Sequence, residues 1–405
     1  MSPTTAARAG VRPVFVLLAI LALGLNLRAA LSGYPPLLVQ VRTDLGISAA
    51  VAGLVQGGAV VLMGVGSFAA PGLTRLMGRE WAAAAAMGAL ALGNLVRGIP
   101  ATLALVVGSL LIGAGIGVTG VAITGVVRDH LPERAGAATG LYTVAMMAGA
   151  TVASLTALPF ASLLGGWSGS LAVWSLPAAL ALVVWVPVTR RLARSDSPVA
   201  AAVPLPWRNR FARLAVAFQA TSSLQFYAWL TWLAPFYEAQ GLSVERAAVI
   251  LSVWNVVQIP AALVIPAVAE RHRTWARWAA FCAVCGGLGV AGLLVAPLAP
   301  VVGPWPWVVL TSVAVGAGFP LGLAVIAWRT PDGATSASVS ALALGVAYVL
   351  AGIAPLLMGA LIDAAGFSAA LWVVVAAVAA QALVVVRLGP RRVTYEALSS
   401  RAGRS

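Results

Sequence analysis

The sequence predicts an all-α membrane protein with twelve transmembrane helices in two six-helix pseudo-repeats. First, 61% of the residues are hydrophobic and only 9% are charged, whereas about 25% of a typical soluble domain is charged. Second, apolar runs near the roughly 20 residues that a bilayer crossing needs recur twelve times along the chain. Third, the arginines gather in every second segment between these runs, which places most of them on one side of a membrane. Lipid is therefore the expected solvent for most of the surface.

The predicted spans are bounded by charged residues or by glycine and proline. They cover residues 13–41, 48–72, 80–98, 101–127, 136–162, 170–189, 210–238, 244–268, 276–297, 304–328, 336–362 and 367–387.

The arginine distribution predicts the orientation. With the N-terminus inside, 21 of the 25 arginines fall on the cytoplasmic side and only Arg42, Arg97 and Arg246 fall outside. Because cytoplasmic loops are enriched in basic residues, both termini are expected in the cytoplasm, with the protein in the cell membrane. The net charge of +14 does not indicate nucleic-acid binding, because the arginines form short clusters between apolar runs.

A polar, proline-containing and basic segment, residues 193–208, is predicted to be a cytoplasmic linker between bundles 1–192 and 209–405. The two halves echo each other. The turn DLGIS after the first span has a counterpart in AQGLS after the seventh, with Gly46 and Gly241 at equivalent places. A parallel six-helix repeat predicts this spacing. A monomer in the lipid bilayer is expected.

Arg28 is the most informative residue for function. It lies about 15 residues from either end of the first span, near the bilayer midplane at about 1.5 Å per residue. A central arginine costs about 2.5–3.5 kcal/mol even on insertion scales, so it should face a cavity or a partner. All eleven acidic residues fall at span ends or in loops. A planar guanidinium suits a carboxylate or small oxyanion, so Arg28 is predicted to bind an anionic solute. The alternative is a structural arginine bonded to helix ends.

Further candidates for solute binding are polar or aromatic residues inside apolar runs. They are Asn26, Tyr142, Gln225, Tyr227, Trp232 and Tyr348. Bonding between helices is the alternative for each of them. Gln225, Trp229 and Trp232 share one helical face, which either lines a cavity or packs as a seam.

Two sites are candidates for gating. Tyr34, Pro35 and Pro36 interrupt the first span, as a hinge or simply a kink. Arg75 and Arg79 follow the second span and either latch one conformation or only mark the cytoplasmic side.

No catalytic residue, metal site or cofactor is predicted. The GAGIG segment, Gly113–Gly117, lacks the βαβ context of a dinucleotide loop and indicates close helix packing. Cys282 and Cys285 lie in an apolar run and are interpreted as small buried residues. Since no Asp, Glu or His falls at a span centre, no proton relay is expected within the protein.

Several segments carry a family resemblance. These are LGLNLRAALSGYPPLLVQVRTDLGIS in the first span, APGLTRLMGRE after the second, LQFYAWLTWLAPFYEAQGLS, GAGFPLGLAVIAWRT, and SVSALALGVAYVLAGIAPLLMGALID. Together they resemble the major facilitator superfamily and, within it, the cyanate/nitroimidazole permease branch. The resemblance implies two six-helix bundles around a central cavity that work by alternating access. It implies a small anionic or polar solute, such as a cyanate-like anion, a small carboxylate or a nitro-heterocycle.

Two other functions are weighed against this one. The first is efflux of drug-like organic molecules through a cavity lined by Tyr227, Trp229, Trp232 and Tyr348, although the fifth span lacks an antiporter-like run of glycines followed by Gly-Pro. The second is a membrane-embedded enzyme or receptor. That class needs paired central carboxylates, a histidine cluster or a large soluble domain, and the sequence has none of these.

Overall fold

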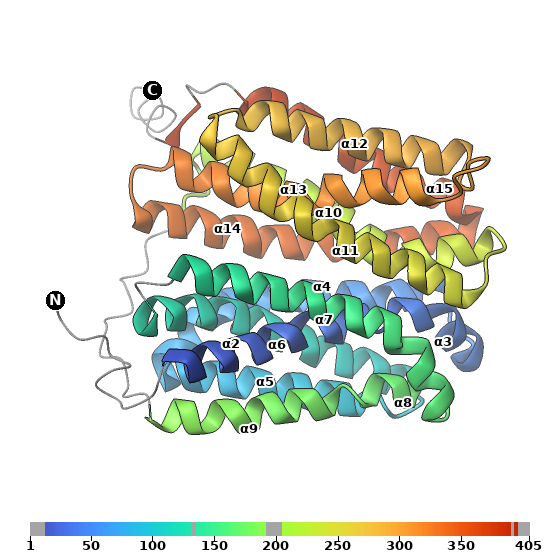
Figure 1. The fold of residues 1–405 in the computed structure, drawn as a ribbon, viewed down its shortest axis with the longest axis horizontal. Coiled ribbons are helices and arrows are strands. Elements are labelled where there is room, and N and C mark those ends of the chain that lie inside the picture. The colour runs from blue at the N-terminus through green and yellow to red at the C-terminus, as the bar shows by residue number, and fades with distance from the viewer. Residues whose placement is uncertain (1–12, 132–134, 192–204, 390–392, 396–405) are drawn as a thin grey trace. The chain divides into compact units, whose positions relative to one another are not determined.

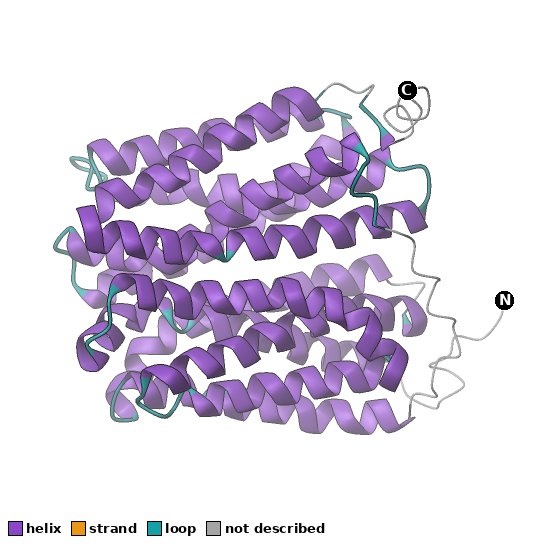
Figure 2. Cartoon of the chain, turned by 180° about the vertical axis from the view of Figure 1, so that it is seen from behind, coloured by secondary structure: helices purple, strands orange, loops and turns teal. Residues whose placement is uncertain are grey.

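The chain folds into long helices joined by short loops, as seen in a computed structural model that describes residues 13–131, 135–191, 205–389 and 393–395 (Figures 1 and 2). The chain divides into two compact units, each with its contacts mainly within itself. Unit 1 contains residues 1–47 and 58–201, and unit 2 contains residues 48–57 and 202–405. Most of the predicted linker, 193–204, lies outside the described residues.

Unit 1 contains the helices of the first half of the chain. They are α2 (Pro13–Ser32), η1 (Pro35–Leu37), α3 (Leu38–Leu45), α4 (Ala49–Met77) from Gly58 onward, α5 (Arg79–Val96), α6 (Thr102–His130), α7 (Ala135–Leu163), α8 (Trp167–Ala172) and α9 (Ser175–Arg191). Helix α5 packs mainly on α6 and α9, whereas α2 packs mainly on α7 and α9. The solute-site candidates of this unit lie on α2 and α7.

Unit 2 contains the first turns of α4 and the helices of the second half. They are α10 (Arg210–Ala239), α11 (Val244–Arg271), α12 (Trp275–Val295), α13 (Trp305–Arg329), α14 (Gly333–Ala351) and α15 (Ile353–Leu388). Helix α10 packs on α14 and α15, and α13 packs on α11 and α12. The carboxylate of Asp363 accepts from the backbone N–H groups of Ala49 (2.9 Å) and Ala50 (2.8 Å), which caps the start of α4.

Glycines set how closely the helices approach one another. A Cβ built on Gly113 would lie 2.0 Å from the carbonyl oxygen of Ala59, and one on Gly117 would lie 2.2 Å from that of Met63. No larger residue fits there unless α4 and α6 separate. The GAGIG segment is therefore a place of close helix packing, as the sequence indicated.

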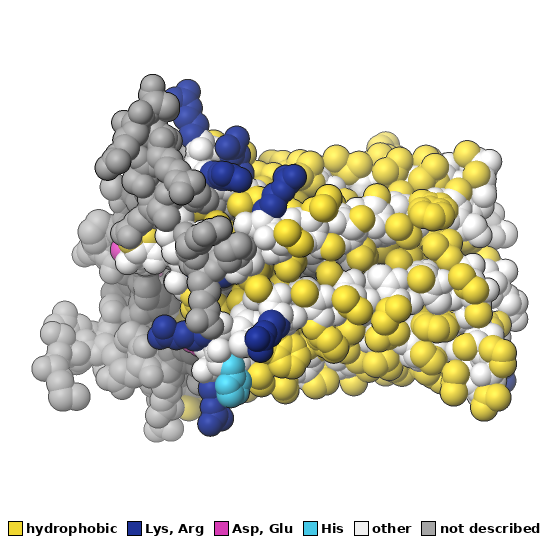
Figure 3. All heavy atoms as spheres, turned by 90° about the horizontal axis from the view of Figure 1, so that it is seen from above, with side chains coloured by type: hydrophobic (Ala, Val, Ile, Leu, Met, Phe, Trp, Pro, Cys, Tyr) yellow, Lys and Arg dark blue, Asp and Glu magenta, His cyan; other side chains and the backbone are white. Residues whose placement is uncertain are grey.

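The surface suits a lipid environment. Nine helical stretches among the described residues are long and apolar enough to cross a membrane, and the last of these, Thr335–Leu388, is 54 residues long. Many large apolar side chains are exposed, including Leu103 at 75% and Leu163 at 77%. Figure 3 shows hydrophobic side chains along most of one face, with arginines gathered at one end.

The helices follow the predicted spans closely. Bounds agree within three residues for α5, α6, α7, α10, α11, α12 and α13. The first span is broken at Tyr34–Pro36 because proline cannot continue a helix hydrogen-bond ladder. In the last stretch the backbone breaks at Gly352 and again at Gly366, where φ is +80°. Glycine adopts that left-handed conformation readily.

Candidate functional site

Arg28 and Tyr142 lie together in unit 1. Arg28 is half-buried, one turn before the end of α2 and midway along the apolar stretch Val14–Leu45. It interacts electrostatically with Tyr142 of α7, which is also half-buried. Gly24 makes this approach possible, because a Cβ there would lie 2.8 Å from the Tyr142 ring. The pair combines a cation with a phenol hydroxyl, a combination suited to holding an anion.

Asn26 faces a different neighbour from Arg28. Its side chain is buried, and its Nδ2 donates to the carbonyl oxygens of Ala22 (2.8 Å) and Pro177 (3.2 Å). Residues two apart on an ideal helix point about 200° apart, so Asn26 lies toward α9 while Arg28 lies near α7. The contacts of Asn26 are those of a tie between α2 and α9.

Tyr227 of α10 and Tyr348 of α14 form the core of an aromatic cluster in unit 2. Their rings lie 6.3 Å apart, edge to face. Phe226 extends the cluster, because its ring lies 5.0 Å from that of Tyr227 and 5.5 Å from that of Trp254 of α11. Tyr348 is half-buried, whereas Tyr227 and Trp254 are buried. Such rings offer flat apolar surface with few hydrogen-bonding groups.

Gln225 and Trp232, also on α10, bond to α15. The Nε2 of Gln225 donates to the Oε1 of Gln381 at 2.8 Å, and the indole N–H of Trp232 donates to the carbonyl of Pro355 at 3.0 Å. Both α10 side chains are at least 98% buried. The structure thus brings two of the four unit 2 candidates together, Tyr227 and Tyr348, and places the other two in interhelical bonds.

The candidate gating residues occupy two places in unit 1. Tyr34, Pro35 and Pro36 are buried at the break between α2 and α3. Arg75 is exposed and its Nε donates to the Pro71 carbonyl at 3.2 Å. The side chain of Arg79 lies against α6, where a Cβ on Gly125 would be 2.6 Å from its Cδ.

Arg97 is a buried polar residue that the sequence interpretation placed on the outer side, at the end of the predicted span 80–98. It is the C-cap of α5 and is fully buried. Its guanidinium donates to the Ala30 carbonyl (2.7 Å) and, through Nε (2.9 Å) and Nη2 (2.7 Å), to Ser109 Oγ. It lies 5.9 Å from the centre of the Tyr34 ring. One sequence signal pointed to it: an arginine on the side with few arginines needs a specific reason to be there.

A second unexpected pair, Glu80 and His130, lies where α5 begins and α6 ends. The Nε2 of His130 is 2.8 Å from Glu80 Oε1, both side chains are buried, and the indole N–H of Trp185 donates to the Glu80 carbonyl at 2.8 Å. The pair ties α5, α6 and α9 together at one end of unit 1. No group of three or more metal-binding side chains occurs among the described residues.

A third group, Gln219 and Ser222 of α10, lies in the interior of unit 2. Both are at least 99% buried, and within the described part of the chain neither the Gln219 amide nor the Ser222 hydroxyl has a hydrogen-bond partner. They face glycines of α13, since a Cβ on Gly322 would lie 2.1 Å from Gln219 Oε1 and one on Gly318 would lie 2.6 Å from Ser222 Oγ.

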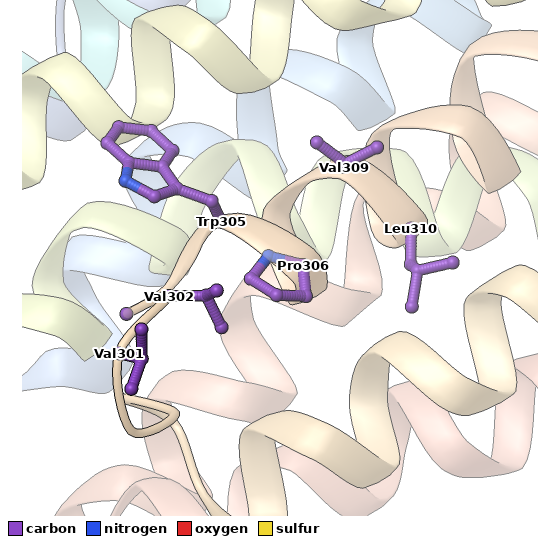
Figure 4. A pocket seen from close by; sticks show the side chains of 7 residues that line it. Val301, Val302, Trp305, Pro306, Val309 and Leu310 are labelled. Atoms are coloured by element: carbon purple, nitrogen blue, oxygen red, sulfur yellow. The ribbon is translucent and has the colours of Figure 1, made fainter.

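An apolar groove lies elsewhere in unit 2, at the start of α13 (Figure 4). Its described lining, which includes Val301, Val302, Trp305 and Leu310, holds no charged side chain. A groove of this composition offers mainly apolar contacts, together with the indole N–H of Trp305. None of the predicted solute-binding residues lies in it.

The fold and these residues define an α-helical membrane protein with polar and aromatic groups buried along apolar helices. Residues 14–311 match the family model described as Major Facilitator Superfamily, and the chain belongs to that family. It is therefore a multi-pass membrane transporter for a small-molecule substrate and not an enzyme.

Curated relatives cover most of the chain. The uncharacterized transporter YycB of Bacillus subtilis (strain 168) is 25% identical over 87% of this chain and 88% of its own length. The cyanate transport protein CynX of Escherichia coli (strain K12) is 27% identical over 87% and 91%. The 2-nitroimidazole transporter of the same organism is 27% identical over 88% and 90%.

Solved structures show the same fold at low sequence identity. The inward-open xylose transporter XylE from E. coli superposes with a TM-score of 0.76 at 11% identity, covering 96% of this chain and all of that one. A D-xylose–proton symporter gives 0.74 at 13% identity, covering 93% and 97%. These matches establish the major facilitator fold.

Proposed function

We propose that this protein carries a small anionic or polar solute across the cell membrane by alternating access, with Arg28 as the anion anchor. The solute class is a cyanate-like anion, a small carboxylate or a nitro-heterocycle. Tyr142 lies beside Arg28 and supplies a hydroxyl to the same solute.

The observation that carries the proposal is the place of Arg28. A half-buried guanidinium lies midway along a 32-residue apolar stretch, next to a tyrosine. A charge at that depth is costly and is kept mainly where it serves a solute pathway. A cationic solute would be repelled there, whereas a planar anion can bond to two guanidinium N–H groups at once.

The relatives support the solute class. Two of them are named for cyanate and for 2-nitroimidazole, and each covers at least 87% of this chain. Both solutes are small, flat and polar.

The membrane topology is a further part of the proposal. We infer twelve spans in two pseudo-repeats, 1–192 and 209–405, with a cytoplasmic linker at 193–208, both termini in the cytoplasm and a monomeric protein. The excess of arginines on one side supports the orientation. The long stretch Thr335–Leu388, with its break at Gly366, supports two crossings there.

Thiol labelling tests this topology. In a background with Cys282→Ala and Cys285→Ala, an impermeant maleimide added to intact cells should label Ser243→Cys but not Ala200→Cys. Permeabilised cells provide the control, since both thiols should then react. Labelling of Ala200→Cys in intact cells would contradict the proposed orientation.

The anchor is tested by binding of cyanate, formate and 2-nitroimidazole to purified variants. Arg28→Ala removes a charge-assisted contact of about 1.5–3 kcal/mol, so cyanate affinity should fall roughly ten- to two-hundredfold. Arg28→Lys keeps the charge but loses the planar fork, so a smaller loss is expected. Asn26→Ala is the matched control on the same helix and should mainly lower folded yield. Normal affinity in well-folded Arg28→Ala protein would refute the anchor.

The second candidate function is efflux of drug-like organic molecules. The aromatic cluster of Phe226, Tyr227, Trp254 and Tyr348 favours it, because stacked rings bind flat apolar molecules. If Arg28→Ala leaves anion affinity unchanged while Tyr348→Ala weakens binding of an aromatic dye, this function replaces the first.

A further inference from the structure

The last turn of α2 needs partners for its carbonyl groups, because the helix ends at Ser32 before two prolines. Three of these carbonyls have identified donors. The Gly33 N–H donates to Ala29 O at 3.1 Å, Arg97 Nη1 donates to Ala30 O at 2.7 Å, and Ser154 Oγ donates to Ser32 O at 3.2 Å. The donor to Ala30 comes from another helix and is charged.

Arg97 contacts the last turn of α2 and the first residue of the break that follows it. Its guanidinium bonds to Ala30 before the break and lies 5.9 Å from the ring of Tyr34 within it. Ser109 anchors the same guanidinium to α6 and itself donates to Leu105 O at 2.6 Å. Arg97 therefore joins α5 and α6 to the end of α2.

Few other contacts join α2 to α5 and α6. Helix α2 packs extensively on α7 and α9 but only slightly on α5 and α6. No carboxylate of the described residues pairs with Arg97, so the cation is held by dipoles and by one aromatic ring. The geometry of this contact is specific, because the planar guanidinium bonds to Ala30 of α2 and to Ser109 of α6 at once.

We propose that Arg97 is a positioning residue for the solute site, holding the last turn of α2 so that Arg28 keeps its place beside Tyr142. The proposal rests on the proposed function of Arg28. In this proposal Arg97 fixes the last turn of α2 against Tyr34, the first residue of the break, and against Ser109 of α6.

Arg329 provides a matched control. This arginine of α13 donates to the carbonyls of Leu388 and Gly389 at the end of α15, and its guanidinium lies 5.5 Å from the centre of the Trp275 ring. The chemistry is that of Arg97, but the site is in unit 2. Arg329→Lys therefore removes an equivalent fork without touching α2.

The first test reads the position of residue 28 without any solute. The thiol of an Arg28→Cys variant, in the Cys282→Ala, Cys285→Ala background, is reacted with sulfonatoethyl methanethiosulfonate. Arg97→Lys should raise the rate of this reaction roughly tenfold, which is the size of effect expected between energetically coupled residues. Ser109→Ala should raise it less. Arg329→Lys should change it by less than about twofold. Equal effects of Arg97→Lys and Arg329→Lys, or no reaction in any background, would overturn the proposal.

The second test is a double-mutant cycle with cyanate. Arg97→Lys should weaken cyanate binding roughly tenfold when Arg28 is present and should have no further effect in the Arg28→Ala protein. The same loss in both backgrounds would mean a general structural role and would overturn the proposal. If Arg28→Ala alone changes nothing, the proposed function fails, and the thiol rates still decide the role of Arg97.

Discussion

Two buried polar clusters, one in each unit, differ in whether their polar atoms are hydrogen-bonded. In the Arg97 cluster (Arg97, Ser109 and Ala30) the guanidinium nitrogens and the serine hydroxyl all have hydrogen-bond partners. In the Gln219 cluster (Gln219, Ser222 and the glycines Gly318 and Gly322) the amide and the hydroxyl have none among the described residues. Both clusters are at least 99% buried at their polar side chains.

The difference is one of rigidity. A buried polar group with full hydrogen bonding holds one arrangement, because every alternative loses bonds. A buried amide without partners costs about 1–3 kcal/mol and has no preferred orientation. Arg97 is thus suited to hold α2 in place, whereas among the described residues no hydrogen bond from the Gln219 amide or the Ser222 hydroxyl fixes α10 against α13.

The largest expected effect comes from replacing each central polar residue by methionine. Arg97→Met removes three hydrogen bonds and leaves the Ala30 carbonyl without a donor, so a loss of about 2–3 kcal/mol is expected. Gln219→Met removes an amide without partners and should stabilise the protein by about 1–2 kcal/mol. The measurement is the thermal unfolding midpoint in detergent, followed by size-exclusion chromatography.

Opposite signs for these two variants would confirm the comparison. Met is nearly the size of Gln but shorter than Arg, so Arg97→Met also leaves a cavity, which acts in the same direction as its lost hydrogen bonds. A rise in the midpoint for Arg97→Met would show that the desolvation cost of the buried cation exceeds its bonds. A fall for Gln219→Met would show that the amide has partners in solution.

The helices were largely predictable from the sequence because their signals are local. Length and apolarity predicted a span at 210–238, and α10 runs from Arg210 to Ala239. The break in the first span followed from Pro35 and Pro36, and the close packing at Gly113 and Gly117 followed from their spacing. The sequence signal for each of these features lies within one helix turn or one helix length.

The arrangement of the site was less predictable because it depends on distant partners. Arg97 is buried since Ala30, 67 positions away, supplies a carbonyl at the end of another helix. Gln225 meets Gln381 across 156 positions. The sequence marked Arg28 and Tyr142 as candidates, but their proximity depends on Gly24 and on how α2 crosses α7. Periodicity alone holds no information on such crossings.

The smaller expected effect comes from adding one methyl group beside each cluster. In Gly93→Ala the new Cβ would lie 2.6 Å from the backbone oxygen of Gly108. This steric clash can be relieved only if α5 and α6 move apart. That movement also pulls Arg97 from Ser109, so a loss of about 1–3 kcal/mol is expected. In Gly322→Ala the new Cβ would meet the amide end of Gln219 at 2.1 Å. That amide has no bonds to break and can rotate away, so the loss should stay below about 1 kcal/mol.

The helix preference of alanine over glycine, about 0.5–1 kcal/mol, favours both variants equally and must be separated from packing. Gly120→Ala in α6 measures it, because among the described residues no atom beyond its chain neighbours and the adjacent backbone of α6 lies within 4 Å of a Cβ built there. Unfolding midpoints of the three variants should then rank Gly120→Ala highest, Gly322→Ala next and Gly93→Ala lowest. If Gly322→Ala falls as far as Gly93→Ala, the side chain of Gln219 is held as firmly as the backbone of α6. The contrast between a rigid cluster in unit 1 and an adaptable one in unit 2 would then be wrong.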